Sequence, residues 1–296
     1  VFLCVCTYVC VYVYVCVCVM LLTCHLPMLQ EHLIERPAGK VFTQQTSEEA
    51  RLHARTREGV VQHEVVAITL KNLPLHIQRA TVAQHVMALL LAHATRLLDY
   101  HTAVKRGDWS RSPQFCLLDY PIRELRGMAL GIVGYGELGS GVAKLAQAFG
   151  MQVLIAQRPD SEPQAGRVPL DELLPQVDVL TLHVPLTDST QDLIDERRLA
   201  LMRPQALLIN TARGAVVDNQ ALANALRAGV IGGAALDVLD VEPPPLDHPL
   251  LADDVPNLLL TPHSAWAGHQ ARQNVVDQMV ENIQAFLAGE PRNQVN

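Results

Sequence analysis

Short, almost continuously apolar segments alternate with helical patterns along most of the chain after Thr81, and this alternation constrains the fold more than any other feature. The expected strands lie in MALGIVGYG, QVLIA, VDVLTLHV, ALLINTA, GAALDVL and NLLLTPH. Helical segments separate them, among them ELGSGVAKLAQAFG and DNQALANALRAG. Strands that are apolar on both faces belong to parallel sheets covered by helices on both sides. The sequence therefore predicts an α/β fold with a doubly wound parallel sheet.

Two longer helical patterns flank the expected sheet. Residues 81–109 predict a single helix that is amphipathic at first and then buried, with Thr81 as its N-cap. The segment HQARQNVVDQMVENIQAFLAG predicts a long helix near the C-terminus. The first of these helices leads directly into the sheet.

A glycine motif follows the first expected strand. Gly134, Gly136 and Gly139 form the pattern G-x-G-x-x-G, which taken alone is common in turns. Here the motif directly follows a strand and opens a helix, where glycines permit a tight turn and let a pyrophosphate approach free backbone N–H groups. The context predicts a Rossmann-type domain that binds a dinucleotide.

The residues after the second strand predict which cofactor is used. An acidic residue there would bind the adenosine ribose 2′-OH of NAD. This chain has Gln157 and Arg158 instead, and a guanidinium favours a 2′-phosphate. The pattern favours NADP slightly, while NAD remains open because Arg158 can equally be a solvated surface residue.

Three further side chains follow strands that end at one edge of the sheet. Arg213 follows ALLINTA, His263 follows NLLLTP, and Glu242 ends DVLDVE before three prolines. An arginine can hold the carboxylate of a 2-keto acid and polarise its carbonyl, and an imidazole can protonate the carbonyl oxygen during reduction. A carboxylate beside the imidazole would raise its pKa. Each residue alone has an ordinary structural explanation, but their joint placement predicts a catalytic site for hydride transfer.

Charge and cysteine usage narrow the class of protein. The formal net charge of −7 argues against nucleic acid as the main partner. Six of the seven cysteines lie in the first 24 residues, which is unlike a disulfide framework, so we expect a reduced, cytoplasmic enzyme. The pattern predicts no metal site.

The first 22 residues differ from the rest of the chain. They carry no charge and alternate Val with Cys or Tyr, as translated repetitive DNA would. They also lack the basic segment of a signal peptide. We expect residues 1–22 to be a gene-model artefact, with a membrane anchor and a disordered or aggregation-prone segment as the alternatives.

The motifs LGIVGYGELG, HVPLTDST, INTARGAVVD, ALDVLDVEPP and TPHSAW stand in the order and spacing of the D-isomer-specific 2-hydroxyacid dehydrogenases, which the chain resembles from Thr81 onward. FCLLDYPIREL and HSAW look most like the bacterial glycerate dehydrogenases (hydroxypyruvate reductases) of that family. The resemblance implies reduction of a small 2-keto acid such as hydroxypyruvate or glyoxylate, with His263 as proton donor, and a homodimer. It implies cofactor contacts from Glu137, Leu138, Gln157, Thr190, Thr211, Ala212, Arg213, Asp237, His263, Ser264, Ala265 and Trp266, with Asp237 facing the nicotinamide carboxamide.

The N-terminal region departs from the family pattern. A length of 296 residues suggests two domains, and the family has an N-terminal flavodoxin-like substrate domain. We expect residues 23–78, completed by 267–296, to be an incomplete form of that domain, and residues 79–266 to be the dinucleotide-binding domain with its leading interdomain helix. A cofactor-binding but catalytically impaired chain, and a cofactor-sensing interaction protein like the C-terminal-binding corepressors, remain alternatives. The preferred 2-hydroxy acid is left open.

Overall fold

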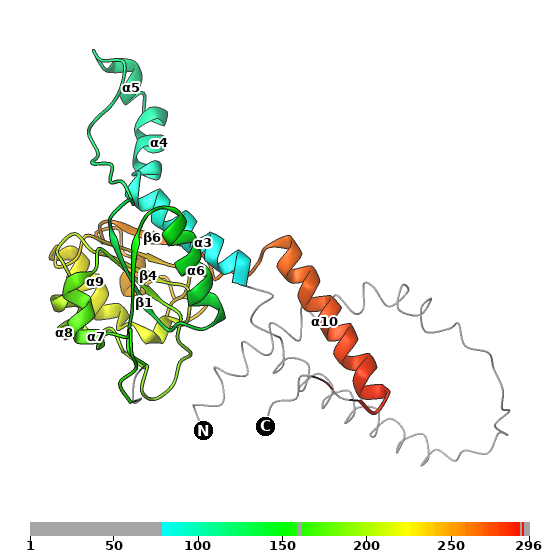
Figure 1. The fold of residues 1–296 in the computed structure, drawn as a ribbon. Coiled ribbons are helices and arrows are strands. Elements are labelled where there is room, and N and C mark those ends of the chain that lie inside the picture. The colour runs from blue at the N-terminus through cyan, green and yellow to red at the C-terminus, as the bar shows by residue number, and fades with distance from the viewer. Residues whose placement is uncertain (1–78, 159–161, 291, 293–296) are drawn as a thin grey trace, which may run out of the picture. The chain divides into compact units, whose positions relative to one another are not determined.

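The computed structural model describes residues 79–158, 162–290 and 292 (Figure 1). The segments 1–22 and 23–78 that the sequence separates lie outside the described residues. A six-stranded parallel sheet with the order β2-β1-β3-β4-β5-β6 forms the centre of the described part. Its strands are β1 (Ala129–Val133), β2 (Gln152–Ile155), β3 (Val179–Leu182), β4 (Leu207–Asn210), β5 (Gly233–Leu236) and β6 (Leu258–Leu260). The doubly wound parallel sheet expected from the sequence is confirmed.

Helices cover both faces of the sheet because alternate residues of the central strands point to opposite sides. In β4, Leu207 and Ile209 belong to a core shared with α3 and α6, whereas Leu208 belongs to a core shared with α8 and α9. All residues of β1, β3, β4 and β5 are buried. The two cores explain why these strands are almost continuously apolar.

The helices follow the expected order. They are α3 (Arg79–Ala94), α4 (Leu97–Lys105), α5 (Asp108–Arg111), α6 (Glu137–Ala148), α7 (Leu170–Leu173), α8 (Glu196–Leu201), α9 (Asn219–Arg227) and α10 (His269–Leu287), with short 3₁₀ turns η2 (Leu174–Gln176), η3 (Gly214–Val216) and η4 (Pro249–Leu251). Among the helices in the described part of the chain, none combines the length and the hydrophobicity that a membrane-spanning helix requires.

The single helix expected over residues 81–109 is wrong, because the structure divides it into α3, α4 and α5. Arg96 adopts a left-handed conformation (φ 53°) and Gly107 a second one (φ 81°), and each ends the run of helical hydrogen bonds. The Arg96 guanidinium compensates for this strain through Asp99 (2.7 Å) and Asn257 (3.1 Å). Thr81 lies inside α3 and is therefore not an N-cap. Tertiary contacts, which periodicity does not report, decide where this helix breaks.

The connections after β1 and β3 leave in opposite directions across the sheet. The chain passes from β1 outward to β2 and then returns to β3 on the other side of β1. Ligands of doubly wound sheets bind beyond the carboxyl ends of the strands at such a switch point. The loops that follow β1, β3, β4, β5 and β6 therefore define where a site can form.

Candidate functional site

The turn between β1 and α6 is built from three glycines that have different roles. Gly134 has a φ of 93°, and a Cβ there would lie 2.4 Å from the carbonyl oxygen of His183. A Cβ on Gly139 would lie 2.1 Å from the carbonyl oxygen of Gly134, so this glycine lets α6 pack closely on the turn. Gly136 instead faces open space, with nothing within 4 Å of a Cβ. The turn thus leaves room for a pyrophosphate at the N-terminus of α6.

Buried polar atoms line the same edge of the sheet. Thr211 Oγ1, just after β4, and His183 Nδ1, just after β3, have no hydrogen-bond partner among the described residues. Burial lowers the pKa of His183 to about 4, so its ring is neutral near pH 7. Buried polar atoms are normally satisfied, and a ligand with hydroxyl and amide groups can supply the missing partners. These features fit a dinucleotide cofactor.

The structure places Gln157 and Arg158 just beyond β2, as expected. The Gln157 side chain donates to Glu162 O (2.6 Å) and accepts from Gln164 N (3.2 Å), so its amide organises the following loop. Arg158 is exposed. A second guanidinium, that of Arg167, lies 5.2 Å from the ring centroid of Tyr135 in the glycine turn. No local pattern in the sequence marks Arg167.

The loop that carries Arg213 is held by Asn210, the last residue of β4. The Asn210 amide donates to the carbonyl oxygen of Arg213 (2.9 Å) and accepts from Ala212 N (3.0 Å). The Arg213 guanidinium donates to Ala212 O (2.6 Å) while its side chain remains exposed. A Cβ on Gly214 would lie 1.8 Å from the carbonyl carbon of Leu239, so only glycine lets this loop pack against the loop that leads to Glu242.

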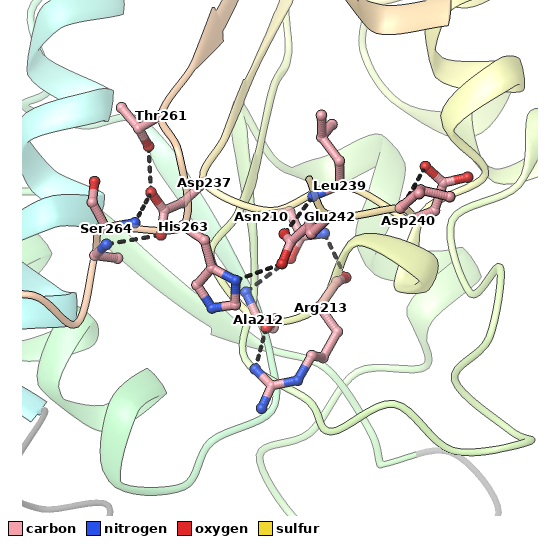
Figure 2. A network of polar contacts seen from close by, with 12 residues as sticks. Asn210, Ala212, Arg213, Asp237, Leu239, Asp240, Glu242, Thr261, His263 and Ser264 are labelled. Atoms are coloured by element: carbon pink, nitrogen blue, oxygen red, sulfur yellow. Dashed lines mark hydrogen bonds and ion pairs between the residues drawn. The ribbon is translucent and has the colours of Figure 1, made fainter. Parts of the chain in front are cut away.

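Glu242 and His263 form a direct pair at this edge (Figure 2). His263 Nδ1 lies 2.6 Å from Glu242 Oε2, and Glu242 Oε1 accepts from Leu239 N (2.9 Å). The hydrogen bond to Glu242 raises the pKa of His263 despite partial burial of the ring. Burial pushes the pKa of Glu242 upward, but the bonds from His263 and Leu239 outweigh it and the pKa is lowered. The nearby Arg213 charge lowers both pKa values. The expected triad of side chains therefore does come together.

The backbone of His263 has a left-handed conformation (φ 49°), which is uncommon for a residue other than glycine. His263 N donates to Asp237 O (2.8 Å), and the Asp237 carboxylate accepts from Ser264 N (2.9 Å) and Ala265 N (2.8 Å). Asp237 is 1% exposed. The end of β5 thus fixes the loop that presents the imidazole.

The other residues expected to contact the cofactor lie at the start of α6 and in the loops that follow β3 and β6. Glu137 and Leu138 open α6, next to the glycine turn. Thr190 is buried in the loop after β3, where its hydroxyl donates to Pro185 O (2.6 Å) and accepts from Thr187 N (2.7 Å). Trp266 follows Ala265 in the loop that begins after β6. Within the described part of the chain, no group of three His, Cys, Asp or Glu side chains is arranged to hold a metal ion.

Several residues that shape the site were not singled out from the sequence. Gly214 follows Arg213 directly, and this position is the only local signal for it. Asn210 ends an expected strand and has no distinguishing pattern. His85 on α3 lies 3.0 Å from Thr261 Oγ1, a contact between residues 176 positions apart. Such a contact cannot be read from periodicity.

Comparison with known proteins identifies relatives that share this domain. The family model described as "D-isomer specific 2-hydroxyacid dehydrogenase, NAD binding domain" matches residues 87–265. The chain is 49% identical over 231 residues to a glycerate dehydrogenase of Methylorubrum extorquens. The matched residues make up 78% of this chain and 71% of that protein.

Solved structures give the same result. An NADPH-dependent glyoxylate/hydroxypyruvate reductase of Sinorhizobium meliloti matches with a TM-score of 0.64 and 32% identity, covering 74% of this chain and 68% of that one. A D-lactate dehydrogenase of Aquifex aeolicus, complexed with NAD and lactic acid, matches with a TM-score of 0.60 and 35% identity, covering 71% of this chain and 67% of that one. The chain belongs to the D-isomer-specific 2-hydroxyacid dehydrogenases, a family of NAD(P)-dependent oxidoreductases.

Proposed function

We propose that the chain reduces hydroxypyruvate or glyoxylate to the corresponding 2-hydroxy acid, with Arg213, Glu242 and His263 as its catalytic residues. The observation that carries this proposal is the 2.6 Å contact between His263 Nδ1 and Glu242 Oε2, beside Arg213 and at the edge of the sheet that holds the glycine turn. The names of the Methylorubrum and Sinorhizobium relatives support this substrate class.

The geometry supports one role for each side chain. A bound nicotinamide cofactor supplies the hydride. The Arg213 fork binds the substrate carboxylate and polarises the adjacent carbonyl. Because His263 Nδ1 is occupied by Glu242, Nε2 is the atom that delivers a proton to the carbonyl oxygen. Glu242 remains ionised and stabilises the imidazolium before that transfer.

The proposal is tested by assaying the full chain with hydroxypyruvate, glyoxylate and pyruvate, while cofactor binding is measured separately by fluorescence. We expect the chain to oxidise NADH or NADPH with the first two substrates and His263→Gln to lower kcat by about 10²–10⁴ with cofactor affinity nearly unchanged. The exposed Lys144→Gln on α6, outside the proposed site and dimer surface, serves as control. Cofactor binding without turnover by the unaltered chain would support the impaired alternative, and a folded His263→Gln variant with full turnover would remove His263 from the mechanism.

The pH dependence of reduction tests the pairing of Glu242 with His263. Since only the protonated imidazole donates, the rate of reduction is constant at low pH and falls as the pH rises through the raised pKa of His263. Glu242→Gln removes the charge that stabilises imidazolium, so we expect the fall to occur at lower pH. The measurement is kcat against pH for both proteins. Superimposable profiles would contradict coupling between the two residues.

For the cofactor, we propose a slight preference for NADP, based on Arg158 and on the absence of an acid at the end of β2. The Arg167 guanidinium over Tyr135 adds a second positive charge near the glycine turn. The two solved relatives described above include one named NADPH-dependent and one complexed with NAD, so the family accommodates both cofactors.

Arg158→Ala tests this preference. A charge-assisted hydrogen bond to a 2′-phosphate predicts that the dissociation constant rises about tenfold more for NADPH than for NADH. Lys144→Ala, which removes an exposed positive charge on α6, is the matched control. Fluorescence titration with both cofactors gives the comparison. Equal weakening of NADH and NADPH binding would assign Arg158 to the solvated surface.

We also propose that the chain forms a homodimer through α4, α5 and the segment that follows them. This region, residues 97–122, buries few of its own side chains: Ala103 is the one buried residue of α4, and α5 buries none. Phe115 is 91% and Leu118 78% exposed. Tyr100 donates to Tyr120 O (2.7 Å) and holds the segment against α4, so the apolar side chains sit on an ordered surface that a second copy could cover.

The double variant Phe115→Asp/Leu118→Asp places two charges on this surface. We expect it to shift sedimentation from dimer to monomer, because charges in an apolar interface cannot be solvated. Leu246→Asp, at a leucine that is 98% exposed outside this segment, should leave the dimer intact. A monomeric unaltered chain, or a double variant that remains dimeric, would refute the assignment.

Two further assignments rest on the sequence pattern. We propose that residues 23–78 and 267–296 contribute to substrate binding, as the family resemblance implies. We also propose a cytoplasmic location, which the cysteine distribution supports. Cys116 is a free thiol in the described part of the chain.

A further inference from the structure

His263 presents its imidazole from a backbone conformation that needs external support. A left-handed φ of 49° carries a conformational cost at a residue other than glycine. The neighbouring backbone must therefore be held by contacts that outweigh this cost. Those contacts come from Asp237, whose main-chain oxygen accepts from His263 N and whose carboxylate accepts from Ser264 N and Ala265 N.

Asp237 also binds the residue at the start of the loop. The Thr261 hydroxyl donates to Asp237 Oδ1 at 2.5 Å. The carboxylate thus holds the chain on both sides of His263, two residues before it and one and two residues after it. Burial raises the pKa of Asp237, but the hydrogen bonds from His85, Thr261 and the two backbone N–H groups outweigh it, so the carboxylate stays ionised.

The side chain of His85 reaches this cluster from outside the loop. His85 Nε2 lies 3.0 Å from Thr261 Oγ1 and 3.4 Å from Asp237 Oδ1. The Thr261 hydroxyl has one proton and donates it to Asp237, so its oxygen can only accept from His85. The His85 ring must therefore carry its proton on Nε2. α3 contacts the same loop a second time, since a Cβ on Gly268 would lie 2.8 Å from Thr81 Cγ2.

We propose that His85 is a positioning residue for the reaction: its Nε2–H fixes Thr261 and Asp237, and these hold residues 261–265 in the conformation that directs His263 at the substrate. The inference rests on the proposed function, because it gives the His263 loop a catalytic purpose. Under this proposal α3 has two roles. It covers one face of the sheet, and through His85 it helps to fix the geometry of the site.

The kinetic test compares two replacements of His85. Leu removes the donor, whereas Gln can place its Nε2 near the position of the imidazole Nε2. We expect His85→Leu to lower kcat about tenfold or more, since small displacements of a catalytic group are costly, while the KM for cofactor changes little. His85→Gln should restore most of the rate, and the exposed Lys144→Leu on α6 should have no effect. Equal losses in the Leu and Gln variants, or an unchanged kcat in His85→Leu, would overturn the proposal.

If His85→Leu fails to fold, Thr261→Val and Thr261→Ser test the same link from its other end. Val removes the hydroxyl and should lower kcat, whereas Ser keeps it and should preserve kcat. Equal effects of Val and Ser would contradict the link.

A spectroscopic readout separates this proposal from the function itself. In ¹⁵N-histidine-labelled full chain, we expect NMR to report His85 as the Nε2–H tautomer. The ring signals of His263 should shift in His85→Leu and return towards their original positions in His85→Gln. This result can be obtained even if no 2-keto acid is reduced, which would refute the proposed function alone. A His85 ring protonated on Nδ1, or His263 signals unaffected by His85→Leu, would refute the positioning role.

Discussion

The backbone contact between Gly214 and the turn at Leu239–Asp240 is the constraint on which the site depends. The carbonyl carbon of Leu239 would lie 1.8 Å from a Cβ on Gly214, so any side chain there would separate the two loops. One of these loops follows β4 and carries Arg213, and the other follows β5 and carries Glu242. Parallel neighbouring strands bring the two loops to one edge of the sheet, and the absence of a side chain at Gly214 allows them to touch.

The pair formed by Glu242 and His263 depends on that contact in turn. The Leu239 N–H donates to Glu242 Oε1, so the turn packed on Gly214 also orients the carboxylate toward the imidazole. A carboxylate held by two donors stays ionised, and an imidazole beside it stays protonated to higher pH. The chemistry of the pair is therefore set by backbone packing several residues away. The close packing at Gly214 thus orients the Glu242 carboxylate, and this carboxylate in turn raises the pKa of His263.

The sequence predicted those parts of the molecule that local pattern encodes. The apolar strands and the glycine motif gave the sheet and its cofactor turn, because burial on both faces and the steric freedom of glycine each leave a local signature. The break at Arg96 left none, since ion pairing with Asp99 and contact with Asn257 compensate for its left-handed backbone. In contrast to this break, the residues Arg213, Glu242 and His263 could be predicted from their positions after the expected strands. The support that Asn210 gives to the Arg213 loop could not be predicted, because an asparagine amide shows its use only in the folded chain.

The buried carboxylate of Asp237 fixes the conformation of the His263 loop. A charge that is 1% exposed must be compensated by hydrogen bonds, and each hydrogen bond to such a charged group typically contributes about 1.5–3 kcal/mol. Its donors come from Thr261, Ser264, Ala265 and His85, so the loop cannot change conformation without leaving the charge unsatisfied. The same free energy that penalises motion offsets the strained φ of His263. A catalytic group held in this way needs little reorganisation when the substrate binds, which is the physical advantage of placing a buried charge at the end of β5.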